Sequence, residues 1–591
     1  ELFKEARYEE SVEFFNKSML YNTDAEMSAT ALFWEAEAMF RMGDYNGALK
    51  KFKAFMVTPG TYSLELYPRA TYNIAYCYFK QKDYASALTN FRKFTSSSRV
   101  DDQMLKADAY VRSGDCFFVN KRYEDAINAY NTAIDMNAYD KDYALYQKSI
   151  SLGAMGNFAG KAWILKTLVK LPEKSPLRDD AIFELATTYV IMNETDNALQ
   201  YFQMLYTDYP RSSYAITALQ KTGLIYYNQN KNTEAIAVLK QVAEGYPQSP
   251  EAKEALASLR NIYVDMGRVD EYFNYAKNIS YADISYAEQD SLTYIAVENK
   301  YMDGDCSFAI NGFRSYLEKY PEGAFIINAN YYKADCEYRN NNIAAALENY
   351  EAVAAAPRTR FTENALVKAS AIRFAQEEYV NALAHYEDLL EVAEFPENIL
   401  AAKVGLMRSN AAMGNYEPAI EASLNVLAEK TAGERLLTEA HMTIARAAYA
   451  LDDFNNALAE YKIVVERDRG DLGAEAKYFV CLINFKSGDL DKAEEEVFSL
   501  IENFSSSDYW FARAFILLSD IYVEKDNLFQ ARQTLQSIID NYNGEDLVME
   551  AQEKLNVIIE MEKEEIETLS GDSTEIQVPE PAENDTLNEK F

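Results

Sequence analysis

Apolar residues recur along most of this chain at intervals of three and four residues, the spacing of one face of an α-helix. Residues 209–247 show the pattern clearly. Two amphipathic segments are joined by a polar turn at residues 228–232, and a Tyr-Pro pair stands at each end. Proline disfavours a helical conformation in the residue before it, so each pair ends the preceding helix. The pattern predicts a hairpin of two helices.

Two amphipathic helices cannot bury both apolar faces against each other alone, so this hairpin needs copies of itself on either side. Gly223 and Ala235 are small enough to let the two helices approach closely. We expect Leu219, Tyr226 and Leu239 to fill the space between them.

Copies of the hairpin occupy nearly the whole chain. The residue that opens the second helix of each copy recurs at roughly 37-residue intervals. Aligned in this way are Ser11, Ala48, Ala87, Ala126, Lys161, Ala198, Ala235, Tyr272, Ala309, Ala346, Ala382, Ala419, Ala457, Ala493 and Ala531. The alignment predicts about fourteen full repeats after one incomplete repeat. In residues 1–19 the turn motif comes so early that Glu1 falls within a first helix, and we expect further repeats upstream.

Two copies carry a large residue at the small position. Lys161 marks a degenerate repeat, and Tyr272 is expected to push its two helices apart and bend the array. In residues 31–138, by contrast, the copies are regular. There we expect the aromatic residue before each second helix to meet, in the core, the one four residues after the alanine; these are Tyr45, Tyr84 and Tyr123, and Phe52, Phe91 and Tyr130.

The last part of the chain changes character. Residues 546–569 have one apolar face and become almost wholly charged, as expected of a helix that caps a repeat array. Residues 570–591 are acidic, contain prolines and show no apolar periodicity, which predicts a disordered tail.

The hairpin pattern resembles the tetratricopeptide repeat (TPR), which has an aromatic residue or Leu, then Leu-Gly, Tyr, Ala, Phe and a closing Pro. In residues 209–247, Leu219, Gly223, Tyr226, Ala235, Leu239 and Pro247 follow this spacing, while Thr222 stands at the family's Leu position. The resemblance covers nearly all of residues 1–543. It implies an all-α fold in which about fourteen hairpins, within residues 1–545, form a right-handed α-solenoid. The first helices of such arrays line a concave surface that holds protein or peptide partners.

Composition and charge narrow the function further. Aromatic residues make up 13% of the 591 residues, whereas Gly and Pro number only 21 and 13, which favours a helical array. The net charge of −35 disfavours binding to nucleic acid and to anionic bilayers. No apolar run reaches the roughly 20 residues needed to span a membrane.

The sequence offers little for catalysis or metal binding. His385 and His441 are the only histidines, they lie in different repeats, and no metalloprotease, hydrolase or phosphate-loop motif occurs. The five cysteines form no CxxC pair. Cys77, Cys116 and Cys336 share one position in their first helices, where we expect buried, reduced side chains. We therefore expect a protein that is not an enzyme and has no cofactor and no metal site.

The best candidate for a binding groove is a group of tyrosines in two adjacent repeats. By family register Tyr294, Tyr301, Tyr331 and Tyr338 face the concave surface, where tyrosines offer flat contact area to a partner. The alternative is that they only fill space between repeats.

A second candidate surface is basic. Lys368, Arg408 and Arg446 fall in three successive repeats, with Lys403 and Tyr449 nearby, and are suited to an acidic peptide or a C-terminal carboxylate. The alternative is ion pairing with neighbouring Glu or Asp residues.

The segments between repeats, YPRSSYA, YPQSPEA and YPEGAF, resemble those of bacterial cell-envelope TPR proteins, and the acidity with many Tyr and Asn residues is similar to sequences of the Bacteroidetes type. The resemblance implies a periplasmic scaffold in an envelope assembly or secretion complex, tethered to the outer membrane through a lipid on an upstream segment. The alternatives are a cytoplasmic location, a regulatory or substrate-recruiting arm of an enzyme encoded upstream, and a self-associating spacer.

Overall fold

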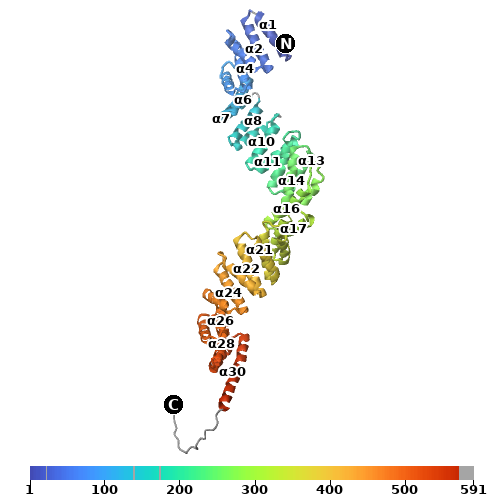
Figure 1. The fold of residues 1–591 in the computed structure, drawn as a ribbon. Helices are drawn as coiled ribbons and strands as arrows, with labels where there is room; N and C mark the ends of the chain where they lie inside the picture. Colours follow the sequence, from blue (N-terminus) through green and yellow to red (C-terminus); the bar gives the residue numbers. More distant parts are fainter. Residues whose placement is uncertain (22, 138–139, 172–174, 572–591) are drawn as a thin grey trace, which may run out of the picture. The chain divides into compact units, whose positions relative to one another are not determined.

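The structure, a computed structural model, describes residues 1–571 apart from 22, 138–139 and 172–174. It contains thirty α-helices and one short 3-10 helix, η1 (Thr61–Ser63), and the described residues contain no β-strand. Figure 1 shows the helices in chain order. The all-α fold predicted from the sequence is confirmed. The predicted disordered tail, residues 570–591, lies outside the described residues from position 572 onward.

The helices are α1 (Tyr8–Tyr21), α2 (Ala25–Arg41), α3 (Tyr45–Val57), α4 (Leu66–Lys80), α5 (Tyr84–Thr95), α6 (Gln103–Val119), α7 (Tyr123–Met136), α8 (Lys141–Ala154), α9 (Phe158–Val169), α10 (Arg178–Ile191), α11 (Thr195–Asp208), α12 (Ala215–Asn228), α13 (Asn232–Gly245), α14 (Pro250–Asp265), α15 (Val269–Ala276), α16 (Tyr286–Met302), α17 (Cys306–Lys319), α18 (Ile326–Arg339), α19 (Ile343–Ala354), α20 (Thr362–Ala375), α21 (Tyr379–Val392), α22 (Pro396–Met413), α23 (Tyr416–Leu427), α24 (Glu434–Ala450), α25 (Phe454–Arg467), α26 (Asp471–Lys486), α27 (Leu490–Asn503), α28 (Asp508–Glu524), α29 (Leu528–Asn541) and α30 (Glu545–Gly571).

These helices form the expected series of hairpins. Helix α1 is a second helix, the helices from α2 to α29 make fourteen pairs, and α30 follows them. Residues 1–6 form one hydrogen-bonded turn before α1. The fourteen pairs agree with the repeat number derived from the sequence.

A recurring turn joins the two helices of a hairpin. In the hairpin of α2 and α3, Gly43 has φ 85°, in the left-handed region that glycine adopts without strain. The next residue, Asp44, then accepts a hydrogen bond of 2.8 Å from the N–H of Gly47 and so caps α3. Asp83 and Asp305 cap α5 and α17 in the same way.

Small residues at the crossing points allow the helices to pack closely. The aligned alanines from Ala48 to Ala531 are all fully buried. In the hairpin of α12 and α13, Leu239 packs so close to Gly223 that a Cβ there would lie 2.7 Å from its Cγ. Leu219 and Leu239 are buried in the same hairpin, as predicted.

The two irregular repeats accommodate their large residues in different ways. Lys161 is buried beside Gly153, where a Cβ would lie 2.9 Å from its Cδ, and its ammonium group lies 2.5 Å from Glu184. A small residue on the first helix thus compensates for the large one on the second. Tyr272 is buried against Tyr263, with ring centroids 6.4 Å apart, and its helix α15 has only eight residues.

The chain divides into two compact units, residues 1–285 and 286–591, in the segment between this shortened hairpin and α16. The bend expected at Tyr272 stays a prediction.

The aromatic residues of the turns pack against the ends of their own first helices. Tyr45, Tyr84 and Tyr123 contact the last aromatic residue of their own first helix, with centroid distances of 5.3, 5.7 and 5.5 Å to Phe40, Phe79 and Phe118. The second set of aromatic side chains is fully buried; these are Phe52, Phe91 and Tyr130. The tight turn holds each turn tyrosine beside the end of its first helix, and Tyr84 also packs against the core cluster that contains Phe91. For the other two pairs the meeting in the core stays a prediction.

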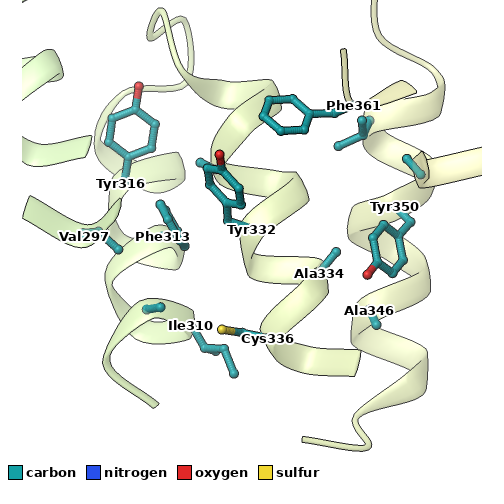
Figure 2. Packing of buried hydrophobic residues seen from close by; sticks show 14 of the residues in the cluster. Val297, Ile310, Phe313, Tyr316, Tyr332, Ala334, Cys336, Ala346, Tyr350 and Phe361 are labelled. Carbon is teal, nitrogen blue, oxygen red and sulfur yellow. The ribbon is translucent and has the colours of Figure 1, made fainter. Parts of the chain in front are cut away.

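A large core cluster at the start of the second unit spans α16 to α20. Figure 2 shows Tyr332 at its centre, between Phe313 at 6.2 Å and Phe361 at 5.4 Å. The cluster includes Cys336, which forms a disulfide with Cys306. The expected reduced state of Cys336 was wrong. Cys306, the first residue of α17, lies beside α18, and its Cα is 5.2 Å from the Cα of Cys336. Cys77 and Cys116 are buried free thiols, as expected.

Within each unit, first helices of neighbouring hairpins contact each other directly, as at α2 and α4, α20 and α22, and α28 and α30. Apart from α15, the second helices from α3 to α29 each contact the first helix before and the first helix after them along the chain. The first helices therefore line the inner side of the local curve, the surface on which the candidate residues are predicted to lie.

Candidate interaction surface

The structure places Tyr294 inside the protein. Its side chain is 2% exposed, its ring stacks on Phe325 at 4.4 Å, and its hydroxyl donates a hydrogen bond of 2.7 Å to Glu298. Burial, and next the carboxylate of Glu298, raise the pKa of this tyrosine. The ring is not available to a partner, so the placement of Tyr294 on a groove surface was wrong.

Tyr301 and Tyr331 are half-buried. The hydroxyl of Tyr301 donates a hydrogen bond of 2.8 Å to Asp335 on the next first helix, and its ring stacks on Tyr332 at 4.4 Å. Tyr331 stacks on Phe361 at 4.6 Å. Both residues link neighbouring repeats and are only partly exposed.

Tyr338 is the most accessible of the four tyrosines, with 39% of its surface exposed. The ammonium group of Lys368, on the next first helix, lies 4.7 Å from its ring centroid, within the range of a cation–π interaction. This pair joins the aromatic and the basic candidates into one surface over α18 and α20.

The two arginines of the basic candidate are each paired with a glutamate. Arg408 donates hydrogen bonds of 2.7 and 2.8 Å to Glu439, and Arg446 donates bonds of 2.8 and 2.7 Å to Glu475. In both pairs the acid lies on the next first helix. The alternative of internal ion pairing is what the geometry shows, and each guanidinium keeps about half of its side chain exposed, at 44% and 53%.

The neighbours of these arginines are engaged as well. Lys403 forms an ion pair with Glu429. Tyr449 contacts Phe454 and Phe479, and the ammonium group of Lys486 lies 5.0 Å from its ring centroid. The bidentate arginine pairs and these contacts connect successive repeats along α22, α24 and α26.

Sequence reasoning missed a buried polar network in the first unit. The hydroxyls of Tyr72 and Tyr76 donate hydrogen bonds of 2.7 and 2.5 Å to the same oxygen of Asp108, and Arg112 lies 3.2 Å from the other oxygen. The tyrosines are on α4 and the acid on α6, so these bonds join two first helices.

Arg112 extends the network to the next repeat. It lies 2.8 Å from Asp115 and 3.4 Å from Asp140, and its guanidinium stacks on the ring of Tyr143 at 5.0 Å. Asp115 also accepts a hydrogen bond of 2.8 Å from Tyr130. Burial raises the pKa of Asp115 although Arg112 opposes this effect. The signal in the sequence was a run of polar residues at positions where first helices are otherwise apolar.

The chemistry of the described residues is that of packing and pairing. His385 lies 3.0 Å from Glu351, and His441 lies 2.6 Å from Glu460, each a pair between helices. Among the described residues, no group of three or more His, Cys, Asp or Glu side chains is placed to hold a metal ion. None of the described helices has both the length and the apolar character that a bilayer-spanning segment needs.

Comparison with family models identifies the repeats. Tetratricopeptide repeat models match residues 69–97, 107–140, 180–212, 217–249 and 442–508. The chain contains tetratricopeptide repeats. The matched segments lie in both units and coincide with hairpins of the structure, including that of α12 and α13. TPR repeats generally act in protein–protein interaction rather than catalysis, and the fold of this TPR protein supports that class.

The solved structures that match this chain include several TPR proteins. The C-terminal part of a TPR repeat-containing protein from Cytophaga hutchinsonii is 16% identical, covers 43% of this chain and 96% of its own, and has a TM-score of 0.37. A tetratricopeptide repeat protein from Parabacteroides merdae is 16% identical, with coverages of 45% and 98% and a TM-score of 0.23. Yeast Tom70 is 14% identical, with coverages of 78% and 97% and a TM-score of 0.23. The comparison with curated proteins finds no matching sequence.

Proposed function

We propose that this TPR protein is a non-catalytic scaffold of the bacterial cell envelope, which holds protein partners on the inner surface formed by its first helices. The TPR repeats and the direct contacts between neighbouring first helices support the scaffold role. The exposed ring of Tyr338, with Lys368 against it, is the part of the predicted tyrosine group that is accessible to a partner.

The observation that carries the location is the disulfide between Cys306 and Cys336. Structural disulfides form and persist in oxidising compartments and are rare in a reducing cytoplasm. Together with the envelope-type segments between repeats, this bond favours the periplasm. Within the envelope, the scaffold serves an assembly or secretion complex.

Crosslinking of the native protein in intact cells, followed by affinity purification and peptide mapping, tests the scaffold role. We expect partner proteins joined to residues on first helices, near Tyr338 in particular. A stable oligomer with crosslinks only between copies of this chain would contradict the proposal and favour the self-associating spacer.

Cell fractionation with thiol labelling tests the location. Alkylation during lysis, before and after reduction, is expected to show Cys306 and Cys336 protected until reduction and the protein in the periplasmic or outer-membrane fraction. A cytoplasmic protein with both thiols labelled at once would overturn this part of the proposal.

A further inference from the structure

The inner surface of the second unit contains an open groove at its C-terminal end. The groove has a volume of about 430 Å³ and is lined by α26, α28 and α30. Its apolar lining comes from Phe485, Val523, Val557, Ile558 and Met561. All three helices are at first-helix positions, so this groove continues the surface that neighbouring first helices form along the unit.

Helix α30 contributes an apolar stripe that the described residues leave uncovered. One face of the helix, with Leu555 and Ile558, is buried against the preceding hairpin. Val557 and Met561, one turn apart beside that face, are 58% and 42% exposed. No described hairpin follows α30. Exposed apolar residues that line a groove and are spaced along one helix face suit a partner helix.

The rim of the groove is acidic. Among the described residues that line the groove, Lys554 is the only basic one, and its ammonium group is paired with Asp520 at 2.6 Å. Glu524 and Glu553, on the two sides of the groove, have no basic partner among the described residues. The groove therefore carries an uncompensated negative charge beside its apolar floor.

We propose that this groove binds an amphipathic helix of a partner protein that carries Leu-like residues on one face and Lys or Arg residues beside them. The apolar face lies on Val557, Met561 and Val523, and the basic residues lie within reach of Glu524 and Glu553. The acidic rim repels acidic helices, including a second copy of this highly acidic chain. This inference rests on the proposed scaffold function and names one of its binding sites.

The test uses the full chain and a fluorescein-labelled amphipathic helix built only of Leu and Lys, with binding followed by fluorescence anisotropy. The same helix with Glu in place of Lys is the charge control. We expect the Lys helix to bind with an affinity that falls as salt is raised, and the Glu helix not to bind.

Because any cationic peptide is attracted to a chain of net charge −35, matched variants separate the groove from the general field. Val557→Lys places a charge in the groove, and Met549→Lys places the same charge at an exposed position of α30 outside the groove lining. We expect Val557→Lys to weaken binding about tenfold or more and Met549→Lys to change it by about twofold or less. Equal effects of the two variants would overturn the inference.

The same variants distinguish this inference from the scaffold proposal. If crosslinking captures partners equally well with wild-type protein and with Val557→Lys, the scaffold function stands and the groove is not its binding site. If no partner is captured by either protein, the scaffold proposal itself fails.

Discussion

Arg446 on α24 donates two hydrogen bonds to Glu475 on α26, so one repeat holds the next through a bidentate ion pair on the inner surface. Arg408 and Glu439 repeat the arrangement one hairpin earlier. The two arginines, which suggested ligand binding in the sequence, thus hold neighbouring repeats together. The pairs are partly exposed, which limits what each contributes to stability.

A double-mutant cycle on Arg446 and Glu475 tests this assignment. We expect Arg446→Ala to lower the free energy of unfolding by about 1 kcal/mol or less, because the guanidinium is half exposed and screened by solvent. Glu475→Ala is expected to cost about as much, and the double variant no more than either single variant. Urea unfolding measures all three. Strictly additive effects would show that the two side chains do not interact.

The close approach of two helices predicts that alanine substitution costs much more stability at one glycine of a hairpin than at another. In Gly223→Ala the new Cβ would lie 2.7 Å from Cγ of the buried Leu239, so we expect a loss of about 1–3 kcal/mol in stability. Gly245→Ala is the matched control, because nothing lies within 4 Å of a Cβ there. Its effect is expected to stay within about 0.5 kcal/mol. Thermal or urea unfolding that ranks the two variants in the opposite order would contradict the packing described here.

The disulfide predicts a measurable dependence on reductant. It joins residues 30 positions apart, and a closed loop of this length stabilises a fold by about 3–4 kcal/mol. Reduction, or Cys306→Ser, is expected to lower the stability of the second unit by that amount. Cys481→Ser, which removes a buried free thiol, is the control whose response to reductant matches that of the wild type. A wild-type unfolding transition unchanged by dithiothreitol would count against the bond.

The buried free thiols predict that the stability of the protein depends on pH. Burial raises the pKa of Cys77 and of Cys116 to about 12, whereas a cysteine in the unfolded chain has a pKa of about 8.5. The folded pKa is above the unfolded one, so the stability associated with these thiols is present below about pH 8.5 and is lost as the pH rises toward 12. Titration with a disulfide reagent at pH 8 is expected to be slow in the folded protein. Unfolded protein should show three thiols before reduction and five after it.

The four tyrosines of the candidate groove are expected to separate into two groups. Tyr294→Ala removes a stacked, buried ring and should cost about 3–5 kcal/mol. Tyr338→Ala removes an exposed ring and should cost less than about 1 kcal/mol, while weakening capture of the partner. Lys368→Ala removes the cation that lies over Tyr338 and should act in the same direction. Unchanged partner capture in both Tyr338→Ala and Lys368→Ala would remove this surface from the proposed function.

The sequence by itself determined the repeating unit and its number. Alanine near the start of most second helices, with apolar residues at helical spacing around it, predicts the hairpin, and the described residues contain fourteen hairpins. Local periodicity carries this information because each hairpin packs mainly on its neighbours along the chain.

Only the tertiary structure decided which residues of a first helix are accessible. Tyr294 and Tyr338 both belong to the candidate tyrosine group, yet one is buried under Phe325 and the other is exposed. The spacing of residues in the sequence also left two kinds of contact undetermined: the disulfide partner of Cys336, and the acids that pair with Arg408 and Arg446. Each depends on the rotation and offset between neighbouring helices, which side-chain packing sets in three dimensions and which a one-dimensional pattern does not contain.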